Sequence, residues 1–198
     1  MLDPAFLANA TASFDATPAT GPYTLAMSNS ALFLSLSQIA PASTLQSILG
    51  SIQSQLATAP THLPASYHGS PELTAGYLRQ LSALASFYAQ PKAPSVEIPF
   101  ATGTSLRLIM LHPLSRGTVR LNATHPLEQP VVDYRTGSNP FDFQLHLAHL
   151  KGMRAMWNTP TMKGLGAVEV TPGVGVQSVS GFFFSFHFFL FYLPFCVL

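Results

Sequence analysis

Charge is what this 198-residue sequence has least of. Only 9% of its residues are Asp, Glu, Lys or Arg, against about a quarter in an ordinary soluble domain. A surface with so few charges is poorly solvated, which predicts that part of it is normally covered by something else. The net charge is +1, and the few Lys and Arg are scattered without a basic run. This distribution excludes nucleic-acid binding, because neutralising phosphates requires clustered cations.

Cysteine is nearly absent as well. The single Cys196 excludes an internal disulfide and a zinc site built from several cysteines. No serine stands in a G-x-S-x-G elbow, so hydrolysis by a Ser/His/Asp triad has no support. The opening residues lack a basic stretch followed by an apolar run, and a signal peptide is therefore not expected. Asn9 and Asn122 begin glycosylation sequons, which fit a secreted parent but leave the localisation unknown.

What is present divides into three stretches. Residues 1–30 are small, polar and rich in turn formers, so we expect an irregular N-terminal segment there. Residues 31–173 hold the periodic patterns of regular structure, and we expect them to form one partial domain with a sizeable core. Residues 174–198 form a Phe-rich apolar tail.

Two amphipathic helices are predicted from apolar residues at three- and four-residue steps. The first starts at Pro41, whose φ suits a helix start. Its apolar face consists of Leu45, Ile48, Leu49, Ile52 and Leu56. The second starts with Ser70 as the N-cap and Pro71 in the first position. Its predicted buried stripe consists of Leu73, Tyr77, Leu81, Leu84 and Tyr88.

A third helix is predicted from residue 140 onward. Asn139 is a natural N-cap, Pro140 fits the first turn, and Asp142 favours the positive end of the helix dipole. His146 and His149 share a face of this helix, but no Cys, Asp or Glu cluster accompanies them. We therefore expect a surface or packing role for both and no metal site. The apolar side of the helix consists of Phe141, Leu145, Ala148, Met153, Met156 and Trp157.

Strands are predicted from alternation and from β-branched or apolar runs at residues 95–100, 105–111, 118–121, 131–133 and 167–171. The turn formers at residues 113–117 are expected to join the two strands beside them as a hairpin. In that turn, Arg116 is expected to hold carbonyl groups or to pair with Asp133, and His112 to have a structural role. Successive strands with helices on one side predict an α+β fold with an antiparallel or mixed sheet flanked by helices. The alternating βαβ units of a Rossmann domain are absent from the pattern.

A family resemblance lies in residues 111–121, which read LHPLSRGTVRL. They resemble the HP-x-SRG-x-V-x-L segment of the glucose–methanol–choline (GMC) oxidoreductases. Residues 21–24 (GPYT), 130–133 (PVVD) and 139–142 (NPFD) resemble further segments of that family in the same order. A chance match would have to reproduce order and spacing together. The chain is thus similar to the GMC substrate-binding domain over roughly residues 15–173.

The resemblance implies an intact enzyme that binds FAD and oxidises an alcohol or a sugar-like hydroxyl, with a histidine base removing the hydroxyl proton. The family binds FAD through a strand, a Gly-rich loop and a helix. Residues 164–169 and 173–175 each carry a G-x-G without a third glycine, and neither is expected between a strand and a helix start. The family's catalytic histidine lies beyond the segment that Pro172 and Gly173 resemble. We therefore assign no catalytic, cofactor-binding or metal residue and expect the chain alone to be inactive.

The resemblance also implies that this part of the chain walls one side of a substrate pocket. The candidates for lining it are Phe100, Tyr134 and Phe141, each of which could equally belong to the core. The expected partner is a small-molecule alcohol, bound by the intact enzyme.

The tail from Phe182 to Leu198 is apolar with few interruptions, and its length is at the lower limit for a membrane span. A tail anchor would make the chain a membrane-tethered or partner-binding domain without catalysis. Against an anchor stand His187, Pro194 and the lack of flanking Lys or Arg. A translated non-coding stretch, such as an intron retained after Gly173, would give the same bias to pyrimidine-rich codons, and we favour this interpretation.

Overall fold

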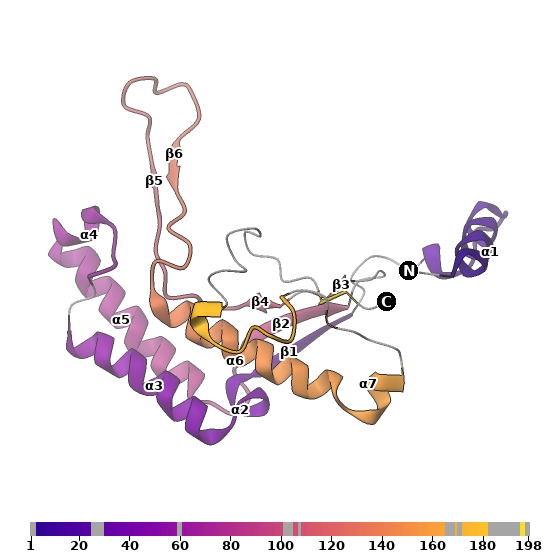
Figure 1. Cartoon of the computed structure of the whole chain (residues 1–198). Helices are drawn as coiled ribbons and strands as arrows, with labels where there is room; N and C mark the ends of the chain where they lie inside the picture. The colour runs from indigo at the N-terminus through magenta and orange to yellow at the C-terminus, as the bar shows by residue number, and fades with distance from the viewer. Residues whose placement is uncertain are drawn as a thin grey trace. The chain divides into compact units, whose positions relative to one another are not determined.

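A computed structural model describes residues 3–24, 30–58, 61–100, 105–106, 108–164, 169, 172–181 and 195–196 (Figure 1). Contacts divide the chain into two compact units. The first unit consists of Met1–Phe33, Val96–Ile109 and Met153–Leu198. The second unit consists of Leu34–Ser95 and Met110–Gly152, and it contains the candidate functional site. The division into residues 1–30, 31–173 and 174–198 stays a prediction.

Helices build most of the second unit, namely α2 (Leu36–Ile39), α3 (Ala42–Ala57), α4 (Ala65–His68), α5 (Pro71–Tyr88) and the first part of α6 (Pro140–Trp157). The three long helices are those predicted from apolar periodicity. Pro41 is the N-cap residue of α3, and the Ser70 hydroxyl caps α5 by accepting the N–H of Leu73 at 3.3 Å. The helices α3 and α5 lie side by side (Figure 1).

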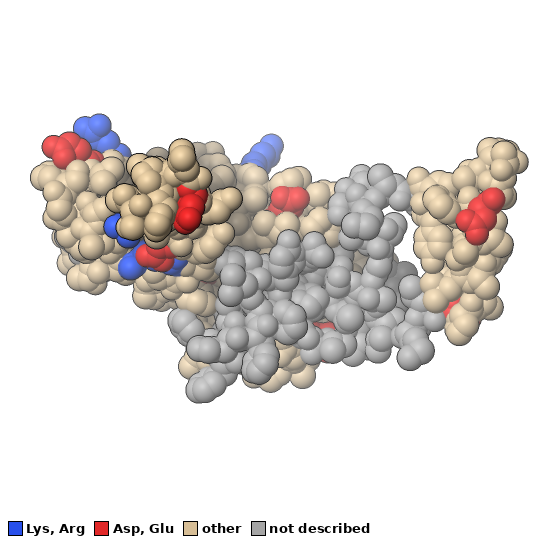
Figure 2. All heavy atoms as spheres, turned by 90° about the horizontal axis from the view of Figure 1, so that it is seen from above, with Lys and Arg blue, Asp and Glu red and all other residues tan. Residues whose placement is uncertain are grey.

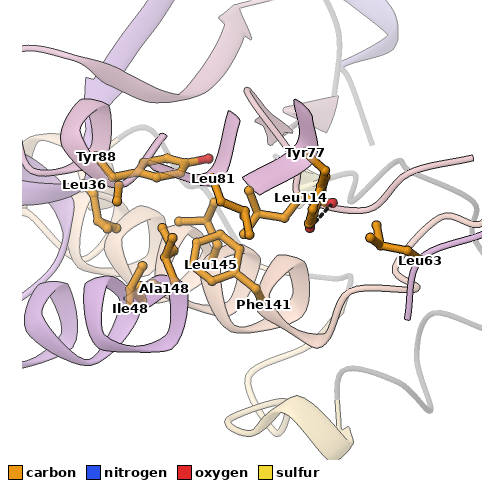
Figure 3. Close-up of a cluster of buried hydrophobic side chains, with 12 residues drawn as sticks. Leu36, Ile48, Leu63, Tyr77, Leu81, Tyr88, Leu114, Phe141, Leu145 and Ala148 are labelled. Atoms are coloured by element: carbon orange, nitrogen blue, oxygen red, sulfur yellow. Dashed lines mark hydrogen bonds between the residues drawn. The ribbon is translucent and has the colours of Figure 1, made fainter. Parts of the chain in front are cut away.

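One hydrophobic core holds the second unit together (Figure 3). Its buried side chains come from the three long helices, from α2 and from the loops at Leu63 and Leu114. Tyr77, Leu81 and Tyr88 are buried as the predicted stripe of α5 requires. Leu73 is the exception, because it is 46% exposed. The core begins one turn further along the helix, at Tyr77, so the first turn of α5 extends past it.

The strands of the described residues form three small sheets. One sheet has the order β1-β2-β4, with β1 at Ser30–Ser35, β2 at Pro94–Phe100 and β4 at Ile109–Met110. The second pairs β5 (Thr118–Arg120) antiparallel with β6 (Val131–Asp133), and the third pairs β3 (Ser105–Leu106) with β7 (Phe195–Cys196). Helices together with these sheets confirm the α+β class.

The expected hairpin around residues 113–117 is wrong. These residues lead out of β4 and into β5, which pairs with β6 instead of with the strand before the turn. His112 explains the change of direction, because its φ of 57° turns the chain sharply. Its ring packs edge-to-face on Phe87 at 4.7 Å, and its carbonyl accepts the hydroxyl of Tyr88 at 2.8 Å. The single strand expected at residues 105–111 is likewise divided into β3 and β4.

The first unit contains α1 (Pro4–Asp15), η1 (Pro22–Thr24) and α7 (Pro160–Gly164). The helix α1 differs from the irregular segment expected over residues 1–30. The carboxylate of Asp3 caps it by accepting the N–H of Ala5 at 2.9 Å, and Pro4 occupies its first position. A cap followed by proline is the same signal that predicted α5.

The tail from Phe182 to Leu198 falls outside the described residues, apart from the two residues of β7. In the described part of the chain, no helix combines the length and the apolar character that crossing a membrane requires. The tail-anchor and non-coding interpretations both stay predictions. The strand predicted at residues 167–171 also lies outside the described residues, except for Glu169.

Candidate functional site

A single carboxylate fastens the turn at residues 113–117 to the start of α6. Asp142 is 4% exposed. Its two oxygens accept the backbone N–H groups of Leu114 at 2.7 Å and Ser115 at 2.9 Å. The sequence predicted Asp142 only as a partner for the helix dipole, and its place in the first turn of α6 is compatible with both roles. Hydrogen bonds from amides to a carboxylate are among the stronger ones in proteins.

A second set of polar contacts ties α3 and α5 to the same point. Tyr77 donates its hydroxyl to the Leu114 carbonyl at 3.0 Å and accepts from Nδ2 of Asn139 at 3.2 Å. Asn139 and Gln55 exchange amide hydrogen bonds at 2.8 and 3.1 Å. Asn139 also caps α6 as predicted, since its Oδ1 accepts the N–H of Phe141 at 3.0 Å. Sequence reasoning missed Gln55 and the Tyr77 hydroxyl, because no local pattern reports partners 84 or 62 positions away.

The Arg116 side chain also holds the turn at residues 113–117. Its Nη1 donates to the carbonyls of Pro113 at 2.7 Å and Ser115 at 2.8 Å, and its Nη2 donates to Oε1 of Gln80 at 2.9 Å. The guanidinium carbon lies 5.4 Å from the centre of the Tyr77 ring, which is within range of a cation–π contact. The first of the two roles predicted for Arg116, holding carbonyl groups, is confirmed.

Burial governs the protonation of this network. It raises the pKa of Asp142, while the hydrogen bonds from residues 114–115 and the charge of Arg116 oppose the rise. Burial also raises the pKa of Tyr77 and of Tyr88, so both phenols stay neutral donors. The Asp142 carboxylate accepts two backbone N–H groups, and the two phenols keep the protons that they donate. These groups are suited to holding a turn in place.

A cavity of about 300 Å³ lies beside the network, between the end of α3 and the start of α6. It is lined by Ser51, Gln55, Thr58, Thr61, His62, Pro140, Phe141 and Gln144, and more of its wall is apolar than polar. Burial lowers the pKa of His62, against the pull of the Asp142 charge. The cavity is therefore lined by uncharged groups, and its volume is at the low end for a small-molecule site.

The three residues predicted to line a substrate pocket stand in different settings. Phe100 ends β2, and its side chain falls outside the described residues. Tyr134 follows β6 and is 76% exposed. Phe141 is buried in the core with its ring 6.0 Å from that of Tyr88, and it also forms part of the cavity wall. Their assignment to a substrate pocket stays a prediction.

His146 and His149 point into the protein, which confirms the packing role. Nε2 of His149 lies 3.0 Å from the Ser95 hydroxyl, and the two imidazole rings meet edge-to-face at 6.1 Å. Burial lowers the pKa of His146 to about 4 and also lowers that of His149. Among the described residues, no three or more His, Cys, Asp or Glu are grouped so as to hold a metal ion.

Gly173, which begins one of the two G-x-G stretches, lies in a turn that does not fit the phosphates of FAD. Gly173 has a φ of 88°, and its carbonyl accepts from Nη2 of Arg154 at 2.9 Å and from the N–H of Val176 at 3.0 Å. This is a turn held through its oxygen, whereas phosphate binding needs free N–H groups at the start of a helix. Residues 165–168, in the other G-x-G stretch, fall outside the described part of the chain.

Comparison with known proteins gives a consistent set of relatives. Residues 113–180 match the model of the GMC oxidoreductase family. The dehydrogenase xptC of Emericella nidulans is 37% identical over 116 residues, which are 59% of this chain. A solved fungal aryl-alcohol oxidase matches 91% of this chain with 44% identity and a TM-score of 0.76. An FAD-dependent oxidoreductase from Chaetomium thermophilum matches 92% of it with 29% identity and a TM-score of 0.75.

The chain is much shorter than these relatives. It spans 18% of xptC and 30% and 31% of the two solved chains. The stretch that matches the family model contains the turn at residues 113–117, the strands β5 and β6, and α6. Asp142, Asn139 and the turn that Asp142 holds therefore lie in the matched stretch, whereas Gln55 and Tyr77 lie outside it.

Proposed function

Because the chain belongs to the GMC oxidoreductase family, we propose that it forms part of the substrate-binding domain of a flavoprotein that oxidises an alcohol, or a sugar-like hydroxyl, to a carbonyl. Support comes from its similarity over nine tenths of its length to an aryl-alcohol oxidase and to an FAD-dependent oxidoreductase. FAD supplies the redox step in such an enzyme, and the protein supplies binding and orientation.

The proposal rests on the two hydrogen bonds that the Asp142 carboxylate accepts from the backbone of the turn at residues 113–117. The turn holds the residues that resemble the family, and the helix that fixes it lies in the same matched region. The core, the network and the turn belong to the same compact unit, the second one. Its share of catalysis is structural, because a rigid scaffold keeps pocket walls in place for a substrate.

We further propose that the 198-residue chain by itself neither binds FAD tightly nor oxidises alcohols. Gly173 lies in a turn held through its carbonyl oxygen, and both oxygens of Asp142 accept backbone N–H groups. The direct test is to purify the chain and record its absorption spectrum before and after adding aryl and aliphatic alcohols without oxygen. We expect no flavin band. A flavin band that bleaches with alcohol would overturn this part of the proposal.

A chimera tests the scaffold role itself. Residues 31–173 of this chain would replace the matching segment of the fungal aryl-alcohol oxidase, whose fold they share. We expect a soluble chimera that keeps its flavin and oxidises alcohols with an altered substrate preference. A chimera with Asp142→Ala is the matched control, and we expect it to lose flavin more readily. A parent chimera that holds no flavin would contradict the proposed function.

A further inference from the structure

One of the two glycosylation sequons lies in the loop between β5 and β6. Residues 122–124 read NAT, so that Asn122 stands two positions before Thr124. Figure 1 shows this loop extending away from α3 and α5, which belong to the same compact unit. A glycan is bulky, and its acceptor asparagine therefore has to lie in a surface loop. The position of residues 122–124 meets this requirement.

The Asn122 side chain folds over the backbone that follows it. Its Oδ1 accepts the N–H groups of Thr124 and His125, both at 3.2 Å, which is an Asx turn. The glycan of a glycosylated asparagine is attached to Nδ2. In the described part of the chain, Nδ2 of Asn122 has no hydrogen-bond partner and is not buried. The oxygen of this amide thus fixes the turn, and its nitrogen stays available.

The second sequon has a different setting. Asn9 and Thr11 lie inside α1, and Ala10 between them is only 3% exposed. Side chains two positions apart on a helix do not face each other, so the Thr11 hydroxyl points away from the Asn9 amide. In the loop, by contrast, the Asx turn brings the backbone of Thr124 to the Asn122 side chain. The structure therefore favours Asn122 over Asn9 as an acceptor.

Exposed leucines stand on either side of the Asn122 sequon. Leu121 is 69% exposed and Leu127 is 103% exposed. Charged side chains, which would keep such a surface solvated, are sparse on the face seen in Figure 2. Exposed apolar side chains with little charge around them favour association between molecules. A glycan in this loop would supply the polar surface that the amino acids do not.

We propose that Asn122 carries an N-linked glycan, which shields Leu121 and Leu127 from association. The donor is an oligosaccharide whose anomeric carbon is bonded to a lipid pyrophosphate. A bond forms between Nδ2 of Asn122 and this carbon, the bond from the carbon to the pyrophosphate oxygen breaks, and the lipid pyrophosphate leaves. Nδ2 gives up one proton to a base of the transferase. Oδ1 takes no part in the transfer, so the Asx turn can persist afterwards. This site is independent of the redox function proposed above.

The test uses the full chain behind a cleavable secretion leader in a eukaryotic host, where loss of the leader shows entry into the secretory pathway. Peptide N-glycosidase in heavy-oxygen water converts a glycan-bearing asparagine into a labelled aspartate, which mass spectrometry locates. We expect the label at position 122. Thr124→Ala leaves Asn122 and its turn in place but breaks the sequon, and it should abolish the label. Thr124→Ser keeps the sequon and should retain the label.

Asn9→Gln removes the other sequon and is the matched control, because it should leave the label at position 122 unchanged. A chain that has lost its leader but carries no label, or carries it only at Asn9, would refute the site. Light scattering on warming tests the shielding, and we expect Thr124→Ala to aggregate faster than Thr124→Ser. Equal aggregation of these two variants would refute the shielding of Leu121 and Leu127, whatever the label shows.

Discussion

The carboxylate of Asp142 accepts the backbone N–H of Leu114 at 2.7 Å, across 28 positions of sequence. Replacing it by asparagine keeps the size but turns one acceptor into a donor that faces backbone amides. We expect Asp142→Asn to lower the free energy of unfolding by about 1–3 kcal/mol, because buried amides lose their acceptor. Urea unfolding followed by circular dichroism measures this. Asp133→Asn, at an exposed carboxylate, should have almost no effect, and equal losses for both variants would argue against the role of Asp142.

Tyr77→Phe removes one hydroxyl that serves two partners, the Leu114 carbonyl and the Asn139 amide. We expect a loss of about 1–2 kcal/mol in the free energy of unfolding, since both buried groups are left without that partner. Tyr67→Phe is a matched control, because this half-buried ring packs edge-to-face on Tyr77 at 6.2 Å. Differential scanning calorimetry of the two variants should separate them. A Tyr67→Phe loss as large as that of Tyr77→Phe would argue against a specific role for the two hydrogen bonds of the Tyr77 hydroxyl.

Two glycine-to-alanine substitutions should shift stability in opposite directions. Gly117→Ala places a methyl group against the Asp133 carbonyl oxygen, and we expect a loss of roughly 2 kcal/mol or more from the forced backbone shift. Gly50 lies inside α3 with open space around the added methyl, so Gly50→Ala should stabilise the chain by about 0.5–1 kcal/mol. Thermal unfolding of both variants provides the measurement. A neutral Gly117→Ala would mean that the strands separate at this point.

Acid should destabilise the second unit through its buried histidines. Burial lowers the folded-state pKa of His146 from 6.5 to about 4, so the neutral ring favours the folded state. This contribution is complete above pH 6.5 and is lost as the pH falls toward 4. A shift of that size is worth about 3 kcal/mol. In His146→Gln, which cannot titrate, the melting temperature should fall less between pH 7 and pH 4 than in the parent chain. If the melting temperatures of the variant and the parent chain fell equally over this range, a group other than His146 would dominate the sensitivity to acid.

The helices were predictable from the sequence because their signals are local. Ser70 with Pro71, and Asn139 with Pro140, each report a helix start within two residues, and apolar steps report the buried face. The same signal at Asp3 and Pro4 marks α1, although the small polar residues around it favoured an irregular segment. Leu73 fits the spacing of the apolar residues in α5. Its side chain is nevertheless exposed, because the core does not extend to the first turn of that helix.

The strand pairing and the polar network could not be predicted in the same way. Whether β5 pairs backward with β4 or forward with β6 depends on the φ of His112 and on where Asp142 holds the turn. Gln55 meets Asn139 across 84 positions, and both are ordinary amides in the sequence. The turn formers at residues 113–117 and the family resemblance both pointed to this segment, but neither gave information on which side chains fix it.

The hydrogen bonds between the Asp142 carboxylate and residues 114–115 also determine how the LHPLSRGTVRL segment can be transplanted into another protein. The segment reads as a continuous stretch, yet its conformation depends on a carboxylate from α6 and a phenol from α5. Grafted alone into another protein, it would carry two buried amides and a carbonyl with no partner. The smallest portable version is therefore discontinuous: the turn, the first turn of α6 and the Tyr77 face of α5 have to travel together.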